Sequence, residues 1–360
     1  MRTVWLHLVL ALSGLILAYL TWTSETSSGS AEVVTIADCS PQQVRAVTYV
    51  SEARENEFRI EEDRWWARTN REVQTEESPP RRFLLSEESA TSFIDRFAPL
   101  VGNRDLGAVG EDEEEDLGLH EPTATFTVWC GEQERSYEVG GSAFGSGDRY
   151  VRAAEGGSVY LVDSATLGEL RAPESMMQRE LTTLSMPDVY HAEVTAYGRA
   201  LRLQQINRLV ETQAEWVDAE DPTRRNELYT NWMSALRRVR IHQYLDAGQE
   251  PGQEEEGVVN RIPVARITFQ AEDDGVMETV ELLRVDAEGE ASSQYYARSE
   301  ATVMWAKLLR ASAGQVEQDL RSVMGLEVEA ETPSDDEVTS DAESPARPAA
   351  DASVDASMRD

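Results

Sequence analysis

Side chains that could carry acid–base or metal chemistry are few in this sequence. Its four histidines, His7, His120, His191 and His242, lie in separate segments, and no His-Glu-x-x-His motif is present. A Gly-x-Ser-x-Gly nucleophile turn is missing, and His191 lacks the downstream cysteines of a zinc deaminase. Carboxylate pairs for glycoside hydrolysis depend on a separation in space. The residues therefore favour a protein without catalysis, with no catalytic, cofactor-binding or metal site predicted, and an exported hydrolase using carboxylates as acid and base is the alternative.

The two cysteines, Cys39 and Cys130, are too few for a Cys/His zinc set. In an oxidising compartment they could form a disulfide, and otherwise they are two free thiols. Spacing does not decide between these, because a disulfide depends on the distance between the two Cα atoms.

A glycine-rich stretch, Gly140–Gly147, has the composition of a phosphate-binding loop. No Lys-Ser/Thr pair follows it and no helix opens after it, so a hairpin loop between strands is the better interpretation. The acidic runs Glu111–Asp116 and Glu250–Gly257 lack the spacing of an EF-hand, and we expect solvated loops there.

Aromatic side chains could stack on a sugar or a peptide, but their positions in expected strands and helices favour core packing. The tryptophans concerned are Trp65, Trp66, Trp129, Trp216, Trp232 and Trp305.

The charge balance excludes one class of partner. The chain has 67 acidic and 33 basic residues and a formal net charge of −34. Such a surface repels nucleic acid and anionic lipid headgroups, so we expect no nucleic-acid partner.

The first residues predict the compartment. Val4–Trp22 is an apolar run in which His7 is the only ionisable side chain, and this length matches the roughly 20 residues that span a bilayer as a helix. Arg2 precedes the run and acidic residues follow it, so the N-terminus is expected in the cytoplasm and the body in the periplasm. We predict a single-pass inner-membrane protein whose first helix contacts the membrane. A cleaved signal peptide is the alternative, although Trp22 occupies the place of the small cleavage-site residues.

Composition divides the chain into four parts. Residues 1–32 are the predicted anchor with a Ser/Thr/Gly spacer, and residues 327–360 form an acidic tail that we expect to be disordered. Between them, residues 33–186 and 187–326 are predicted as two α+β units, each an antiparallel sheet with helices.

The first unit shows alternating strands and two apolar helix faces. Strands are expected at Val44–Val50, Phe58–Ile60, Arg64–Ala67, Ala124–Cys130, Arg135–Val139, Arg149–Arg152 and Ser158–Val162. Helices are expected at Glu87–Leu100, capped by Ser86, and at Ala165–Leu184.

The second unit repeats this order. Its expected strands are Val189–Ala196, Ala200–Leu203, Val264–Phe269, Thr279–Val285 and Gln294–Ala297, and its expected helices are Glu227–Leu245 and Ala301–Val323. Val47 and Val194, and likewise Tyr150 and Tyr296, are separated by nearly the same number of residues, which is typical of a tandem repeat.

One stretch carries a resemblance. Leu117-Gly118-Leu119-His120-Glu121-Pro122 precedes a strand, then come Val139-Gly140 and Tyr150-Val151-Arg152. This order resembles an uncharacterised bacterial family, a domain of unknown function encoded beside gliding-motility-type ABC transporters, whose members share a short membrane anchor and a repeated α+β body. The likeness covers about Val44–Leu184, and Leu117 stands where the family has an aromatic residue.

The residues that carry this resemblance are structural in type. Gly118 can adopt positive φ and Pro122 fixes the entry to a strand, while Gly140, Tyr150 and Arg152 complete the motif. The resemblance implies an envelope accessory protein with ABC-transporter subunits or other envelope proteins as partners, and it brings no catalytic residue.

Overall fold

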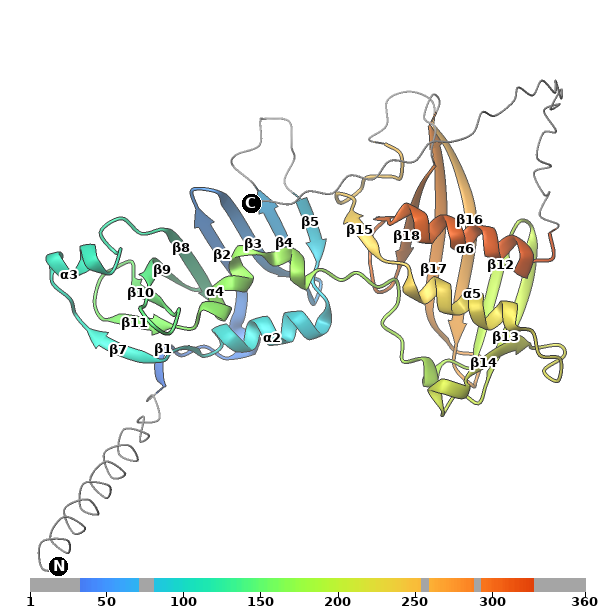
Figure 1. The fold of residues 1–360 in the computed structure, drawn as a ribbon, viewed down its shortest axis with the longest axis horizontal. Helices are drawn as coiled ribbons and strands as arrows, with labels where there is room; N and C mark the ends of the chain where they lie inside the picture. The colour runs from blue at the N-terminus through green and yellow to red at the C-terminus, as the bar shows by residue number, and fades with distance from the viewer. Residues whose placement is uncertain (1–32, 71–80, 254–258, 288–292, 327–360) are drawn as a thin grey trace, which may run out of the picture.

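The computed structural model describes residues 33–70, 81–253, 259–287 and 293–326. They form two lobes that lie side by side, each an antiparallel sheet with two helices on one face (Figure 1). The α+β class predicted from the sequence is confirmed. The predicted membrane segment, the acidic tail and most of the Glu250–Gly257 run lie outside the described residues. Within the described residues no helix is both long and apolar enough to span a bilayer.

The first lobe contains a nine-stranded sheet with the order β5-β4-β3-β2-β8-β9-β10-β11-β7. Its strands are β2 (Val44–Ser51), β3 (Arg54–Glu61), β4 (Arg64–Asn70), β5 (Arg81–Leu84), β7 (Arg104–Gly107), β8 (Ala124–Cys130), β9 (Gln133–Ser142), β10 (Arg149–Ala153) and β11 (Val159–Val162). A separate pair is formed by β1 (Val34–Ala37) and β6 (Leu100–Gly102). The helices are α2 (Glu87–Phe97), α3 (Glu111–Asp116) and α4 (Ser164–Arg171), with short 3-10 turns at Pro41–Gln43 and Pro173–Met176.

The second lobe contains an eight-stranded sheet with the order β14-β13-β12-β16-β17-β18-β19-β15. Its strands are β12 (His191–Ala196), β13 (Arg199–Ile206), β14 (Glu215–Asp218), β15 (Ile241–Tyr244), β16 (Val259–Gln270), β17 (Val276–Ala287), β18 (Gln294–Ser299) and β19 (Ala306–Leu308). The helices are α5 (Glu227–Arg238) and α6 (Arg310–Val323), with 3-10 turns at Met186–Asp188 and Glu211–Gln213.

The two sheets share one strand order. If β12, β13 and β14 are matched to β2, β3 and β4, then β16 to β19 follow as β8 to β11, and β15 takes the place of β7. In the first lobe β7, which follows α2 and β6, pairs with β11, and in the second lobe β15, which follows α5, pairs with β19. The first sheet has β5 in addition. Descent of the two lobes from a tandem duplication stays a prediction, which this order supports.

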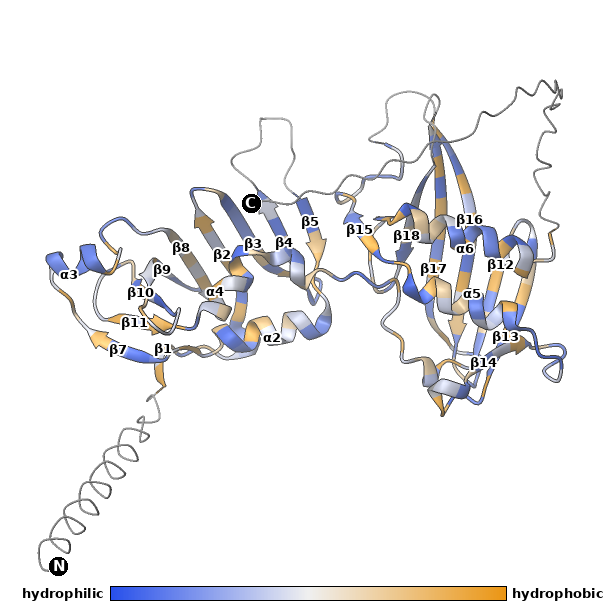
Figure 2. Ribbon diagram, viewed as in Figure 1, coloured by the Kyte–Doolittle hydropathy of each residue, from blue (hydrophilic) through white to orange (hydrophobic). Residues whose placement is uncertain are grey.

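Side-chain alternation explains why these segments are strands. Along β8, Ala124, Phe126 and Val128 are buried while the residues between them are more exposed. Figure 2 shows hydrophobic and hydrophilic residues alternating along the strands of both sheets. This period of two puts one face of each sheet against its helices and leaves the other more polar.

Besides Glu87–Leu100, which ends as a helix at Phe97, three predicted helices are shorter than expected. The segment Ala165–Leu184 is helical only to Arg171, because the backbone leaves helical geometry at Ala172, before Pro173. The residue before a proline is disfavoured in helical geometry. In Glu227–Leu245 the helix ends at Arg238, and Ile241, expected on its apolar face, belongs to strand β15.

The third of these, Ala301–Val323, begins as a helix only at Arg310, because Ala306–Leu308 pairs with β18 and β15. The acidic run Glu111–Asp116 was expected to be a loop but forms the short helix α3, whose first backbone N–H group is satisfied when Gly110 donates to Glu113 Oε2 at 3.1 Å. Of the stretch Gly140–Gly147, the first three residues are the end of strand β9, and only the rest is the expected hairpin loop to the antiparallel β10.

Candidate binding groove

A short linker segment, residues 176–182, joins the two sheets edge to edge. The backbone N–H of Gln178 donates to the carbonyl of Leu84 at 2.8 Å, and that of Ser86 donates to Met176 at 3.0 Å, on the outer side of β5. On the opposite side of the linker, the N–H of Ile241 in β15 donates to the carbonyl of Arg179 at 2.9 Å. The linker therefore occupies the place of a strand between the two sheets and pairs the edge strand of each.

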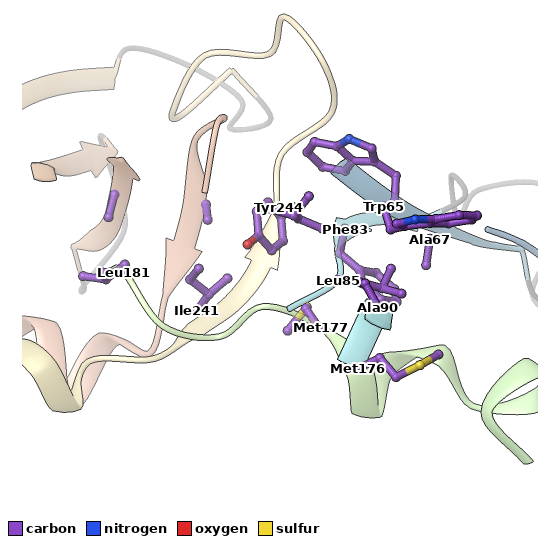
Figure 3. Packing of buried hydrophobic residues seen from close by; sticks show 14 of the residues in the cluster. Trp65, Ala67, Phe83, Leu85, Ala90, Met176, Met177, Leu181, Ile241 and Tyr244 are labelled. Atoms are coloured by element: carbon purple, nitrogen blue, oxygen red, sulfur yellow. The ribbon is translucent and has the colours of Figure 1, made fainter. Parts of the chain in front are cut away.

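Apolar and aromatic contacts reinforce this joint (Figure 3). Trp66 of β4 and Tyr244 of β15 lie edge to face with ring centroids 6.4 Å apart, and the Tyr244 hydroxyl donates to the carbonyl of Gln178 at 3.0 Å. Burial raises the pKa of Tyr244 well above its ordinary value. Leu85, Met177 and Ile241 are buried in one hydrophobic cluster that extends into both lobes. The described residues of the two lobes thus form one packed body.

The linker is also held by a buried carboxyl group. Glu278 of β17 is 2% exposed and accepts hydrogen bonds from the Thr182 hydroxyl at 2.5 Å and from the backbone N–H of Ala301 at 3.2 Å. Ser299 donates its hydroxyl to the carbonyl of Leu181 at 2.6 Å. Burial raises the pKa of Glu278, and these hydrogen bonds oppose the shift.

Beside the joint lies a groove of about 1130 Å³ with residues from both lobes in its lining. One wall is the exposed side of α2, with carboxylates and hydroxyl groups that include Glu88, Ser92 and Asp95. The opposite wall is formed by the linker, which contributes Arg179, and by Arg240 of the second lobe. Arg240 pairs with Glu180 at 3.3 Å. Charges of both signs line the groove.

The side chains that line this groove are suited to binding a partner through hydrogen bonds and ion pairs. Its donors and acceptors can pair with a polar segment of a partner, and sites between domains are common places for binding. Among the residues that the structure describes, no three His, Cys, Asp or Glu side chains gather in a way that could hold a metal ion. Sequence reasoning did not identify the groove, because its two walls are about 90 residues apart in the chain.

The glycines of the motif pack two backbone segments closely together. Gly118 has a φ of +67° and lies over β9, where the N–H of Gly141 donates to the carbonyl of Leu117 at 2.8 Å. A Cβ atom on Gly140 would lie 2.5 Å from the carbonyl oxygen of Leu117. These glycines therefore permit a contact that any side chain would open.

The remaining motif residues lie around this contact. Arg152 pairs with Glu138 at 2.8 Å and also with Glu114 of α3, so it holds the acidic helix against the sheet. Tyr150 is half-buried in β10, and Pro122 precedes Thr123, whose N–H donates to Val139 at 2.8 Å. The motif builds one corner of the first lobe, away from the groove.

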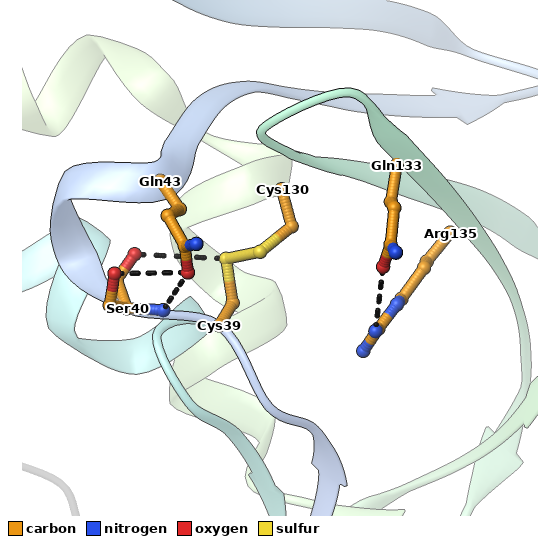
Figure 4. Close-up of a disulfide and its surroundings, with 6 residues drawn as sticks. All are labelled: Cys39, Ser40, Gln43, Cys130, Gln133 and Arg135. Atoms are coloured by element: carbon orange, nitrogen blue, oxygen red, sulfur yellow. Dashed lines mark hydrogen bonds between the residues drawn. A yellow bond between two sulfur atoms is a disulfide. The ribbon is translucent and has the colours of Figure 1, made fainter.

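Cys39 and Cys130 form a disulfide with Cα atoms 6.0 Å apart (Figure 4). The bond joins the segment after β1 to the end of β8, which are 91 residues apart in sequence. Thus the pairing that spacing left open is made in this structure.

Other candidate residues are scattered. Trp65, Trp66, Trp216 and Trp232 are buried, as expected of core residues, whereas Trp129 and Trp305 are only half-buried. His191 lies beside Asp274 and Arg202 at the surface of the second lobe, and its pKa is lowered mainly by partial burial.

Comparison with known proteins gives one match. Residues 103–258 match the family model described as "Domain of unknown function (DUF4340)". The matched region begins at the edge of the first sheet and runs through the joint to β15, so it starts later and ends later than the resemblance found in the sequence. No curated protein matches the chain. No solved structure matches it either.

Proposed function

We propose that this chain is a membrane-anchored, periplasm-facing accessory protein of an ABC-transporter-associated envelope system, and that it binds a partner without catalysis. The observation that supports this most is the joint between the sheets. The linker bonded to both edge strands makes one rigid body from two lobes, and the groove beside it carries side chains from each lobe.

Rigidity matters for this role because a preformed site loses less conformational entropy when its partner binds. The groove presents polar and charged groups, as the rims of protein interfaces do. The apolar run Val4–Trp22 would hold the body at the membrane, close to membrane-embedded partners.

Co-purification tests the proposal. The full chain, extracted in mild detergent, is expected to recover ABC-transporter subunits and to remain in the membrane fraction after washing with carbonate. Ser92→Arg places a long side chain in the groove and should reduce recovery at least fivefold. Gln318→Arg is the matched control, since it makes the same charge change at an exposed position of α6.

Two results would contradict the proposal. One is equal recovery with both variants, which would exclude the groove as the contact. The other is cleavage of envelope glycans or peptides by the purified chain, which would favour the exported hydrolase.

A further inference from the structure

A second cavity, of about 570 Å³, lies on the helix-covered face of the first sheet beside the end of α4. Tyr49 and Val139, both buried, contribute the sheet side of its lining. Helix α4 contributes Leu167, Gly168 and Arg171. The cavity belongs to one lobe and does not touch the groove.

The charge of this cavity is opposite to that of the chain. Arg54, Arg149 and Arg171 line it, and no aspartate or glutamate does. Four other cavities of the described residues each have at least one carboxylate in their lining. Because acidic residues outnumber basic ones by 67 to 33, a cavity with three cations and no anion is a local reversal.

Contacts with backbone carbonyl groups orient two of these guanidinium groups. Arg54 Nη1 donates to the carbonyl of Arg171 at 2.6 Å, and Arg149 Nη1 donates to that of Gly140 at 3.3 Å. Glu174, outside the lining, is 3.7 Å from Arg54. Burial raises the pKa of the Tyr49 hydroxyl, while the charges of Arg171, Arg149 and Arg54 all act to lower it. The three cations therefore surround one hydroxyl group.

The second lobe shows what occupies the corresponding place there. Gly168 and Gly314 are each the fifth residue of their helix, α4 and α6. A Cβ atom on Gly314 would be 3.6 Å from the Tyr295 hydroxyl oxygen, whereas one on Gly168 would have no atom within 4 Å. In the second lobe a tyrosine ring lies against the glycine, and in the first lobe the corresponding space is open.

Charge changes at the same positions. Arg149 corresponds to Tyr295 and Arg171 to Glu317, and both pairs, like the two glycines, are separated by 146 residues. In the second lobe the Tyr295 hydroxyl donates to Glu317 at 2.7 Å, so the two side chains form a hydrogen bond with each other. In the first lobe two arginines stand at these positions, and they cannot pair with each other because both are positively charged donors.

We propose that the cavity binds a small organic molecule through its phosphate group, which would take the place that Tyr295 and Glu317 fill in the second lobe. Guanidinium groups pair with phosphate oxygens through two parallel hydrogen bonds, and a doubly charged phosphate suits three of them better than a single carboxylate does. The cavity volume lies in the range of small-molecule sites, so a phosphorylated organic molecule fits it better than a bare ion. Ser51 and Ser164 add hydroxyl groups for the rest of such a ligand.

Calorimetric titration of the full chain in mild detergent tests this. The probes are glycerol 3-phosphate, malonate as a dicarboxylate, and vesicles of phosphatidylcholine with or without phosphatidic acid. We expect glycerol 3-phosphate or phosphatidic acid vesicles to bind, with an affinity that falls as salt is added. Binding of the soluble probe identifies a free phosphate ester, and binding of the vesicles alone identifies a lipid headgroup. Both outcomes support the phosphate site.

Variants separate the cavity from nonspecific attraction. Arg149→Tyr combined with Arg171→Glu copies the pair of the second lobe, and it should weaken binding at least tenfold while the chain stays folded. Arg45→Glu, at an exposed position of β2, is the charge control and should change binding less than twofold.

The open space at Gly168 provides a second test. Gly168→Leu should abolish binding with no loss of thermal stability, whereas Gly314→Leu should lower the melting temperature because Tyr295 lies there. Absence of binding by every phosphate probe, preference for malonate, or equal binding by the double variant would overturn the proposal.

Discussion

The two lobes have the same strand order but are stabilised differently. In the second lobe α6 packs along α5, and the indole N–H of Trp232 donates to the carbonyl of Val316 at 3.1 Å. In the first lobe the last helix, α4, has 8 residues compared with 14 in α6. The shorter helix covers less of its sheet, and the cavity lined by three arginines lies beside it.

Other contacts stabilise the first lobe. Its core contains a row of aromatic rings in which Phe93 lies 4.5 Å from Phe58 and 5.0 Å from Phe97, measured between centroids. The disulfide is also in this lobe. The second lobe uses a partly buried polar network instead, in which Glu317 joins Arg284 at 2.5 Å and Tyr295 at 2.7 Å. The same strand order is therefore compatible with a shorter helical layer in a lobe whose aromatic core and disulfide supply other stabilising contacts.

The largest effect is expected from Phe93→Ala. This ring is fully buried, and its loss should lower the free energy of unfolding by about 3–5 kcal/mol. Hydrogen exchange should show the loss of protection mainly in the first lobe. An equal loss in both lobes would mean that they unfold as one unit, and Met233→Ala in α5 provides the reciprocal variant.

Removal of the disulfide should have the next largest effect. Cys39→Ser with Cys130→Ser frees a loop closed over 91 residues; loop entropy for that length is about 4.6 kcal/mol, and the typical stabilisation by a disulfide is about 2–4 kcal/mol. Denaturant unfolding with and without reductant measures it. The double variant should not respond to reductant, and a stability equal to that of the oxidised wild type would show that the link does not stabilise the first lobe.

A smaller effect is expected at the joint. Tyr244→Phe keeps the ring against Trp66 but removes the hydroxyl that donates to Gln178, at a cost of about 1–2 kcal/mol. The separation between the unfolding transitions of the two lobes should then increase in a calorimetric scan. Tyr229→Phe on α5 is a matched removal of a hydroxyl from a half-buried ring. If both variants behave alike, the hydrogen bond to the linker does not couple the lobes.

The smallest effect concerns pH. Because the pKa of Glu278 is raised in the folded state, the unfolded state loses its proton at lower pH than the folded state does. The stabilisation is therefore complete below the ordinary pKa of 4.5 and is lost as the pH rises through the folded value.

Glu278→Gln should remove this dependence. Relative to this variant, the wild type should lose stability as the pH rises from about 4 towards neutral. Denaturant unfolding of both proteins across this range gives the difference. A wild type that gains stability relative to the variant as the pH rises would contradict the expected direction.

Local patterns predicted the longer strands of both sheets, missed the short strands β1, β5, β6, β7, β14, β15 and β19, and placed the helix ends poorly. The bounds of β8 agree with the alternation of Ala124, Phe126 and Val128, and Ser86 does cap α2, accepting from Ser89. In the predicted helix Glu227–Leu245, Ile241 is instead a strand residue, because β19 pairs with it there. A pairing between distant segments overrides the helical pattern in that place.

The candidate sites were less predictable than the fold. Arg54, Arg149 and Arg171 are dispersed over more than 100 residues, and only the sheet and α4 bring them together. One signal was present in the sequence, since Gly168 and Gly314 share the repeat spacing while their neighbours Arg171 and Glu317 differ in charge.

The linker also has a consequence for the order of folding during synthesis. Met177 follows the 3-10 turn Pro173–Met176 that comes after α4, so it can cover the outer edge of β5 before any of the second lobe has left the ribosome. Strand β15 is synthesised about 60 residues later and can then add to the other side of the linker. The nascent chain thus protects its own exposed sheet edge from pairing with other chains until the second lobe arrives.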